Sequence, residues 1–188
     1  MTDGMHIEDI PQKPQKQGSF LVEILKSLAI AIVLALFIRT FLLQTFYIPS
    51  ESMVPTLKIN DHVIADKISY RFSDPRRGDI IVFMPPLPSE KYPYVKRLIG
   101  LPGETVELKD NRVYINGEPI EEKYLPEGLK FRNYGPVTVP DNSYFMMGDN
   151  RNNSSDSRVW GFLPEKMIIG KAVVLYWPLD RVRLLTSG

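Results

Sequence analysis

The sequence predicts a mainly β protein, in which a single N-terminal transmembrane helix precedes one antiparallel β domain. Two observations support this fold class. An apolar run extends from Phe20 to Leu43, and short segments rich in β-branched and aromatic residues follow Pro49, separated by turn residues. A length of 188 residues fits one domain with an appendage. We therefore expect a flexible tail over residues 1–19, an anchor helix over residues 20–43 and a β domain over residues 44–188.

The anchor is predicted from its composition. The tail before it is polar and shows no apolar period, whereas the centre of the run, Leu28–Ile38, carries no polar residue on any side. About 20 helical residues cross a hydrocarbon core of roughly 30 Å. A buried helix of a soluble core is one alternative, but a chain of this length has little else to surround such a helix.

A cleaved secretion signal is the other alternative for the apolar run. Cleavage requires small residues just after the apolar stretch, whereas residues 44–48 (QTFYI) are mostly bulky. We therefore expect an uncleaved, single-pass anchor in the cell (plasma) membrane. Lys13, Lys16 and Lys26 lie on the short side of the span and favour a cytoplasmic N-terminus. The β domain would then lie outside the cytoplasm.

Short segments with β character account for most of the remaining chain. The dipeptide Asn116-Gly117 is a strong hairpin signal between two of them. The sixteen prolines suit loops and strand ends rather than helix interiors. The predicted strands are residues 62–67, 79–84, 95–99, 105–108, 112–115, 143–147 and 171–177.

Composition excludes several classes of function. With 23 Lys and Arg against 22 Asp and Glu, the net charge of +1 gives no electrostatic reason to expect a nucleic-acid partner. The absence of cysteine excludes disulfides, a thiol nucleophile and a cysteine-ligated zinc site. His6 and His62 are the only histidines, and His6 lies in the tail. A Ser-His-Asp or histidine-rich metal mechanism would therefore depend on His62 alone.

The first of three polar clusters follows the anchor directly, as PSESMVPTL over residues 49–57. Ser50 and Ser52 lie on the same side of an extended chain. One hydroxyl can then attack a substrate while the other donates a hydrogen bond to a developing oxyanion. Taken alone, the segment is more simply explained as a turn rich in serine and proline.

The second cluster is centred on Lys96, which interrupts an otherwise apolar strand before the turn LIGLPG. A lysine base must have its pKa lowered from ~10.4 toward neutrality, and burial lowers such a pKa by up to ~3–5 units. A neutral Lys96 would then accept a proton from a serine hydroxyl. Taken alone, a strand lysine that extends to solvent is the simpler explanation.

The third cluster is GDNRNNSSDSR over residues 148–158. It does not match an EF-hand calcium loop, because Arg151 stands at the third ligand position and Ser154 replaces the required glycine. A solvated loop is the plain alternative. The functional interpretation is a layer of hydroxyls and carboxylate–guanidinium pairs that orients a catalytic amine.

In combination these segments resemble type I signal peptidase, the leader peptidase family of bacterial membranes. The resemblance covers residues 20–180 and implies a β domain of the signal-peptidase and LexA-like type. Four segments carry it in family order: PSESMVPTL at 49–57, RGDIIVF at 77–83, KRLIGLPGE at 96–104 and GDNRNNSSDSRVWG at 148–161. Asn152 and Glu104 depart from the pattern, because many members carry Asp at both positions.

The resemblance implies a role for each matching residue. Ser52 corresponds to the nucleophile and Lys96 to the general base, while Ser50 and the backbone amide of Ser52 correspond to the oxyanion hole. The supporting residues would be Ser154, which orients the amine, Asp156 beneath the site with Arg158 as its partner, and a second ion pair between Asp149 and Arg97. No cofactor and no metal are implied.

The implied activity is removal of signal peptides with small side chains at positions −1 and −3 from exported preproteins. In an extended substrate these two side chains point to one face, so shallow apolar pockets would hold them. We expect Phe46, Ile48 and Val95 to form the pocket walls. The implied partners are exported preproteins, the lipid bilayer and nearby protein-export machinery, with no nucleic acid.

Two other functions fit part of the sequence. A self-cleaving regulator of the LexA type shares serine–lysine chemistry, but such proteins are soluble and carry a DNA-binding N-terminus. A membrane-anchored β domain that binds secreted proteins without cutting them is the alternative from another class. Loss of Ser52 or Lys96 distinguishes the last case, because a binding protein would not need either side chain.

Overall fold

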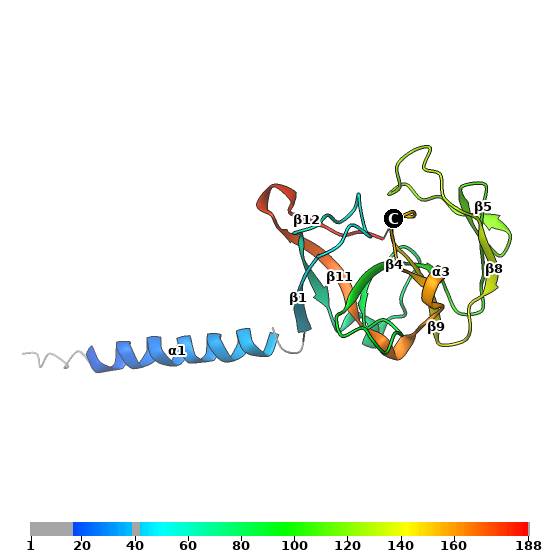
Figure 1. Ribbon diagram of the computed structural model, residues 1–188. Helices are drawn as coiled ribbons and strands as arrows, with labels where there is room; N and C mark the ends of the chain where they lie inside the picture. The colour runs from blue at the N-terminus through cyan, green and yellow to red at the C-terminus, as the bar shows by residue number, and fades with distance from the viewer. Residues whose placement is uncertain (1–16, 39–41, 188) are drawn as a thin grey trace, which may run out of the picture. The chain divides into compact units, whose positions relative to one another are not determined.

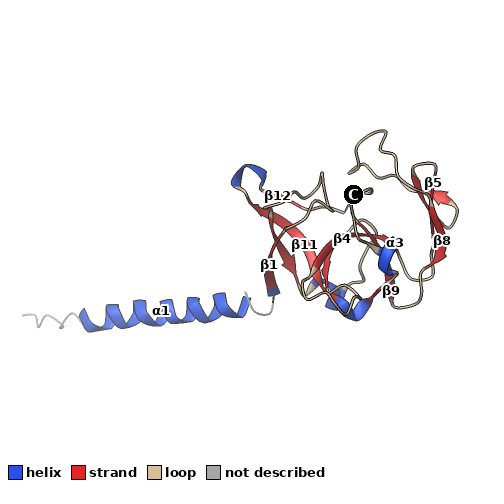
Figure 2. Cartoon of the chain, in the orientation of Figure 1, coloured by secondary structure: helices blue, strands red, loops and turns tan. Residues whose placement is uncertain are grey.

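The structure, a computed structural model, describes residues 17–38 and 42–187. The chain divides into two compact units after Ile38. The predicted tail over residues 1–19 lies almost wholly outside the described residues. Figure 2 shows that the second unit is built of strands and loops, with only short helical segments. The prediction of a mainly β protein with one N-terminal apolar helix is confirmed.

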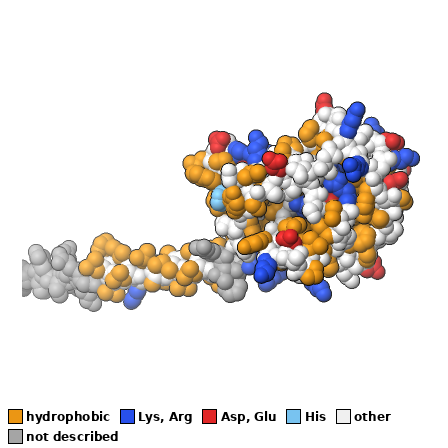
Figure 3. Space-filling view, in the orientation of Figure 1, with side chains coloured by type: hydrophobic (Ala, Val, Ile, Leu, Met, Phe, Trp, Pro, Cys, Tyr) orange, Lys and Arg blue, Asp and Glu red, His pale blue; other side chains and the backbone are white. Residues whose placement is uncertain are grey.

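The first unit contains helix α1 (Gln17–Phe37). Its segment Phe20–Phe37 is long and apolar enough to cross a membrane, and none of this segment is buried. Figure 3 shows apolar side chains along the whole described helix. Helix α1 begins three residues before the predicted anchor and ends at Phe37, and residues 39–41 lie outside the described residues, so the predicted anchor over residues 20–43 stays a prediction.

Leu43, the last residue of the predicted anchor, begins the first strand of the second unit. Strand β1 (Leu43–Tyr47) pairs antiparallel with β2 (His62–Asp66), in a register that runs from Leu43 opposite Asp66 to Tyr47 opposite His62. The backbone amide of Lys67 donates to the carbonyl of Leu42 and continues this ladder. Strand β1 was not among the strands predicted from the sequence, because LQTFY shows no clean alternation and its hydrogen bonds come from a partner distant in the chain.

The larger sheet holds most of the described strands and the buried centre of the second unit. Its order is β1-β2-β11-β3-β4-β9-β10, and β12 pairs with β11. Its other strands are β3 (Ile80–Phe83), β4 (Tyr94–Gly100), β9 (Ser143–Met147), β10 (Leu163–Pro164), β11 (Ile168–Trp177) and β12 (Arg183–Leu184). Short helices α2 (Ser69–Phe72) and α3 (Ser157–Trp160), and turns of 3-10 helix at Glu165–Met167 and Leu179–Arg181, connect them.

A smaller sheet follows β4 in the chain and has the order β7-β6-β5-β8. Figure 1 shows β5 and β8 at the end of the second unit opposite β1 and β12. The strands are β5 (Thr105–Lys109), β6 (Arg112–Ile115), β7 (Glu118–Pro119) and β8 (Tyr134–Thr138). Asn116 and Gly117 both have positive φ between β6 and β7, as the hairpin signal predicted.

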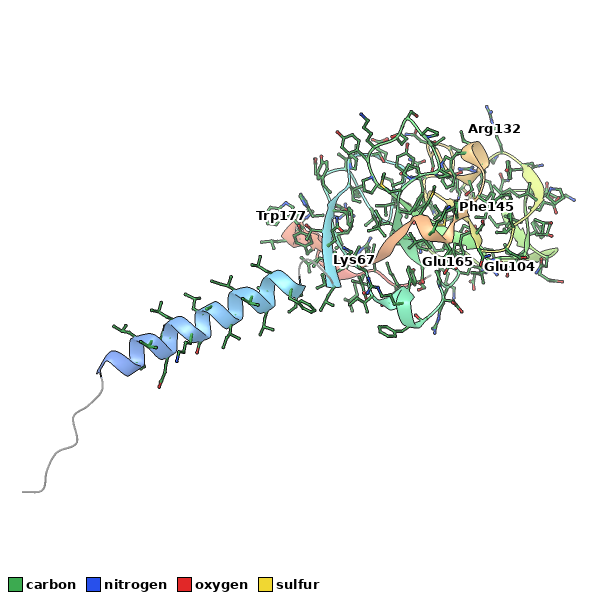
Figure 4. All side chains as sticks on the ribbon, turned by 90° about the horizontal axis from the view of Figure 1, so that it is seen from below. Lys67, Glu104, Arg132, Phe145, Glu165 and Trp177 are labelled. Carbon is green, nitrogen blue, oxygen red and sulfur yellow. The ribbon has the colours of Figure 1, made fainter. Side chains whose placement is uncertain are left out.

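Apolar side chains of both sheets form the core. Phe145 of β9 is fully buried and points into the interior in Figure 4, whereas Trp177 at the end of β11 is 48% exposed. Every strand predicted from the sequence is present, with bounds that agree to within three residues. Strand β8 was missed because its segment, YGPVT, contains a glycine and a proline and shows no clean alternation.

Candidate active site

Ser52 lies in the loop between β1 and β2. This loop is closed at its base, where the amide of Ile48 donates to the carbonyl of Asp61 and the amide of Asn60 donates to the carbonyl of Ile48. Met53, the residue after Ser52, is 1% exposed and belongs to the apolar core. The closed base and the buried methionine therefore hold the backbone of Ser52 in place.

Lys96 lies on β4, a central strand of the larger sheet between β3 and β9. Its backbone is opposite Ile81 of β3. The side chain is almost fully buried at 4% exposure, and Nζ donates to Ser52 Oγ over 2.6 Å and to the carbonyl of Val95 over 3.2 Å. The structure thus brings together the two residues that the sequence assigns to nucleophile and base.

The environment of Lys96 favours its neutral form. Burial lowers the pKa of Lys96 to about 8, although the nearby carboxylates of Asp156 and Asp149 act in the opposite direction. A desolvated ammonium loses hydration that a neutral amine does not need, which is the physical cause of the shift. Lys96 is therefore prepared to accept a proton near neutral pH.

Ser52 and Lys96 open onto a groove with a volume of about 840 Å³. Phe46, Ile48 and Val95, the residues expected to form pocket walls, all line this groove. Ile48 is 3% exposed, whereas Phe46 and Val95 are partly buried and pack against the same core cluster. The groove is thus lined by apolar side chains on the approach to Ser52.

Ser50 lies beside Ser52 at the same groove. Its Oγ is 3.2 Å from Ser52 Oγ, which is hydrogen-bonding distance. Ser50 is exposed, so its hydroxyl is free to turn toward a bound carbonyl. The arrangement places a side-chain donor next to the backbone amide of Ser52.

Asp156 is fully buried beneath the site, at the N-terminus of α3. It forms two hydrogen bonds with the guanidinium of Arg158, at 2.8 and 2.7 Å, and accepts a third from the amide of Gly148 over 3.0 Å. The polar segment that follows β9 is therefore folded around this carboxylate.

Arg97 and Asp149 form a second ion pair, with side chains that are 1% and 0% exposed. Arg97 donates to both oxygens of Asp149, at 2.8 and 2.7 Å, and to the carbonyl of Gly78 over 2.8 Å. Thr56 Oγ1 donates to Asp149 Oδ2 over 2.5 Å. The pair therefore links β4, the end of β9 and the loop of Ser52.

Ser154 was expected to orient the lysine amine. Its Oγ is buried and has no hydrogen-bond partner within the described residues. The two hydrogen bonds that the structure gives to Lys96 Nζ go to Ser52 and Val95. Ser154 Oγ and the carbonyl oxygen of Ser52 both lie so close to Gly148 that a Cβ there would be under 3.0 Å from each of them. Its role as an orienting residue stays a prediction.

Two further parts of the sequence pattern acquire a structural explanation. Arg77 and Glu104, from the second and third motifs, form a two-point ion pair with distances of 3.0 and 2.6 Å. Both carboxylate oxygens of Glu104 therefore accept a hydrogen bond from the guanidinium of Arg77. His62 packs edge-on against Tyr47 and Tyr176, so its place at the start of β2 is structural.

Thr56, Glu122 and Tyr124 are polar residues near the site to which the sequence assigned no role. Tyr124 stacks on the guanidinium of Arg97, and Glu122 pairs with the buried Arg151. Residues 120–131 show neither a motif nor a periodic pattern, so only the threonine, within a motif, had a signal in the sequence. Among the described residues, no group of three or more His, Asp or Glu side chains is placed to hold a metal ion.

Comparisons with known proteins identify the family of this chain. A family model described as "Signal peptidase, peptidase S26" matches residues 21–177. Signal peptidase I of Leptolyngbya laminosa is 51% identical over 173 residues, which cover 89% of this chain and 85% of that protein. A probable signal peptidase I-2 of Synechocystis sp. is 45% identical over 191 residues, covering 100% and 87%.

More distant relatives give the same family name. Signal peptidase I S of Bacillus subtilis is 40% identical over 174 residues, which cover 87% of this chain and 92% of that protein. A crystal structure of a signal peptidase I from Enterococcus faecalis is 37% identical, covers 53% of this chain and 97% of that chain, and gives a TM-score of 0.46. The chain belongs to the signal peptidase I family of S26 serine peptidases, which cleave signal peptides from preproteins.

Proposed function

We propose that this signal peptidase works through a serine–lysine dyad, with Ser52 as nucleophile and Lys96 as general base. The observation that carries the proposal is the 2.6 Å contact between Lys96 Nζ and Ser52 Oγ in an environment that excludes most solvent from the amine. A base must lie within hydrogen-bond reach of the proton that it removes, and its pKa must lie near the working pH. Lys96 meets both requirements.

The reaction proceeds in two balanced steps. Neutral Lys96 accepts the hydroxyl proton of Ser52 while Oγ attacks the scissile carbonyl, and the ammonium then gives this proton to the departing amine, which leaves an acyl-enzyme. In the second step Lys96 accepts a proton from water, whose oxygen attacks the ester. That proton passes to Ser52 Oγ as the ester bond breaks, and the product leaves as a carboxylic acid, which loses its own proton to solvent.

Ser50 supplies the electrostatic part of the mechanism. Its hydroxyl and the backbone amide of Ser52 would donate to the oxyanion that develops during each attack. The 3.2 Å separation of the two serine hydroxyls supports this assignment, because both groups must face the same carbonyl carbon and oxygen.

The groove beside Ser52 supports a proposal for how the substrate binds. We assign the signal peptide's small side chains at −1 and −3 to its apolar part, where Phe46, Ile48 and Val95 are lining residues. Because Ile48 is already buried in the core, it supports the floor of the groove, and Phe46 and Val95 present more surface to the substrate. No cofactor takes part in these steps.

The anchor would hold this site in the cell membrane, in the lipid bilayer and close to the export machinery that delivers preproteins. We assign the N-terminus to the cytoplasm and the catalytic domain to the opposite side, since the lysines before the span follow the positive-inside rule. Protease protection of vesicles that carry tags at either terminus tests this orientation. In vesicles that keep the orientation of the cell, a catalytic domain that external protease cannot reach would contradict it.

Processing of a preprotein by the full chain in detergent tests the chemistry. Wild type is compared with Ser52→Ala and Lys96→Ala, and with Lys109→Ala, an exposed lysine at the end of β5, as the matched control. We expect each dyad variant to lose about 10²–10⁴-fold or more in kcat/KM, and Lys109→Ala to keep its activity. If either dyad variant cleaves at a near-normal rate, the assignment of the dyad is wrong.

A further inference from the structure

The segment between β7 and β8, residues 120–131, carries two partly buried polar side chains, Glu122 and Tyr124, that the mechanism above does not use. Glu122 forms a two-point ion pair with Arg151, with distances of 2.9 and 2.5 Å. The two side chains are 8% and 0% exposed. Removing one partner of such a buried pair leaves the other charge uncompensated, so the pair should contribute to the structure of this region.

Tyr124 joins this ion pair to the one beneath the active site. Its hydroxyl donates to Glu122 Oε1 over 2.5 Å, and its ring lies 3.6 Å from the guanidinium carbon of Arg97. Burial and the charge of Glu122 raise the pKa of Tyr124, so the hydroxyl keeps its proton and remains a donor. Arg97 in turn is bound to Asp149 through two hydrogen bonds.

The residues between these two ion pairs hold the main chain of the nucleophile. The amide of Asn150 donates to the carbonyl of Ser52 over 3.1 Å, and its side-chain nitrogen donates to the carbonyl of Glu51 over 3.2 Å. Gly148 approaches the carbonyl of Ser52 so closely that a Cβ has no room there. The turn over residues 148–152 is therefore in direct contact with the backbone that carries Oγ.

The same turn is fixed from its other side by residues 120–131. Besides the pair between Glu122 and Arg151, the side-chain nitrogen of Asn152 donates to the carbonyl of Lys130 over 2.7 Å. The ring of Phe131 lies 5.3 Å from the guanidinium carbon of Arg151. Residues 148–152 are thus held between the loop of Ser52 and this segment.

We propose that Glu122 and Tyr124 are positioning residues for the peptidase reaction, which fix the turn 148–152 and through it the backbone of Ser52. The proposal rests on the function of Ser52 as nucleophile. It assigns a catalytic purpose to the segment between β7 and β8, and so to the smaller sheet, although this sheet contributes no residue to the groove.

The physical reason is the geometric demand of the attack. A misplacement of about 1 Å at the reacting atoms reduces the rate by about 10²-fold. Glu122 is the carboxylate that neutralises Arg151, whose Nε has no hydrogen-bond partner within the described residues. Without that carboxylate the guanidinium must move toward solvent, and Asn150, its neighbour in the chain, must move with it.

Steady-state kinetics of the full chain in detergent test the proposal with a neighbouring pair of glutamates. Glu122→Gln is compared with Glu121→Gln, whose carboxylate forms only an exposed ion pair with Lys123. We expect Glu122→Gln to lower kcat by about 10–100-fold with KM within about twofold of wild type. Glu121→Gln should leave both constants unchanged. All rates are measured well below each variant's unfolding midpoint.

Tyr124→Phe keeps the proposal testable if Glu122→Gln does not fold. This variant retains the ring over Arg97 and removes only the donor to Glu122, so we expect a decrease in kcat of about 3–10-fold with KM unchanged. Folded variants that show wild-type kcat would overturn the proposal and leave the segment a purely stabilising role. Ser52→Ala is included throughout, because an active Ser52→Ala would contradict the proposed function instead.

Discussion

Lys96 Nζ and Ser52 Oγ are 2.6 Å apart, although 44 positions separate the two residues in the chain. Lys96 is placed by β4, whose pairing with β3 and β9 fixes its direction into the interior. Ser52 is placed by a loop that Met53 attaches to the core. The proposed dyad therefore depends on two supports, one in a sheet and one in a loop, which the ion pair between Arg97 and Asp149 and its contact with Thr56 connect.

The pH dependence of the reaction follows from the state of Lys96. Because its pKa is about 8 and only the neutral amine accepts a proton, kcat/KM should fall as the pH decreases below about 8, by about tenfold per unit at acid pH. Cleavage of a peptide without titratable groups near the scissile bond, measured from about pH 5 to 9, checks this prediction. A flat profile down to about pH 5 would contradict a lysine base.

Ser50 provides a test of the oxyanion hole that leaves the dyad intact. Ser50→Ala removes the side-chain donor, and we expect kcat to fall by about 10²–10³-fold with little change in KM, because the donor acts on charge that develops in the transition state. Ser50→Thr keeps a hydroxyl and serves as the matched variant. Its kcat should lie between those of wild type and Ser50→Ala. An alanine variant with kcat within twofold of wild type would remove Ser50 from the mechanism.

Much of the fold could be predicted because local signals and long-range pairing agree. The alternating segment of β5 and the Asn116-Gly117 turn specify their conformations by themselves. Strand β1 (Leu43–Tyr47) could not be predicted, since its sequence LQTFY shows no clean alternation and its hydrogen bonds come from β2, which is distant in the chain. Local composition does not report a partner that is about 20 residues away.

The residues of the candidate site divide in the same way into those with a signal in the sequence and those fixed only by tertiary contacts. Ser52, Lys96 and the two ion pairs beneath them lie in segments whose residue types are recognisable in the sequence. Glu122 and Tyr124 have no such pattern, because the partner of a buried guanidinium is chosen by tertiary contacts rather than by spacing. The unpaired hydroxyl of Ser154 shows that a residue can be recognised in the sequence while its hydrogen bonds are not.

Gly148 tests how closely the turn supports the nucleophile. In Gly148→Ala the new Cβ would lie under 3.0 Å from Ser154 Oγ and from the backbone oxygen of Ser52. A backbone oxygen cannot turn away, so Ser52 must shift, and we expect kcat to fall by about 10–100-fold. Processing assays on the folded variant measure this effect.

Gly103→Ala is the matched control for that variant. Gly103 has a φ of +78°, and a Cβ there meets nothing within 4 Å. Its substitution should lower stability by about 1–3 kcal/mol through backbone strain, with kcat unchanged. Equal losses of kcat in the two variants would mean that general destabilisation, and not displacement of Ser52, causes the effect.

The burial that activates Lys96 should also reduce the stability of the protein. Its pKa is about 8 in the folded chain and 10.5 in a model compound, so the unfolded state binds more protons between these values and stability rises with pH across this window. Below about pH 8 Lys96 is charged in both the folded and the unfolded state, so the full cost of burying its ammonium opposes folding. Lys96→Met, which removes the charge and keeps the length, should therefore be more stable than wild type at pH 7, by up to about 3 kcal/mol.

Thermal unfolding in detergent at several pH values measures this difference. The unfolding midpoint of Lys96→Met should exceed that of wild type at pH 7, and the excess should shrink as the pH rises from about 8 and disappear above about pH 10.5, where the lysine becomes neutral in both states. Lys109→Met, on an exposed lysine, should show no such trend. A Lys96→Met protein that is less stable than wild type at pH 7 would mean that the hydrogen bond to Ser52 outweighs the desolvation of the ammonium.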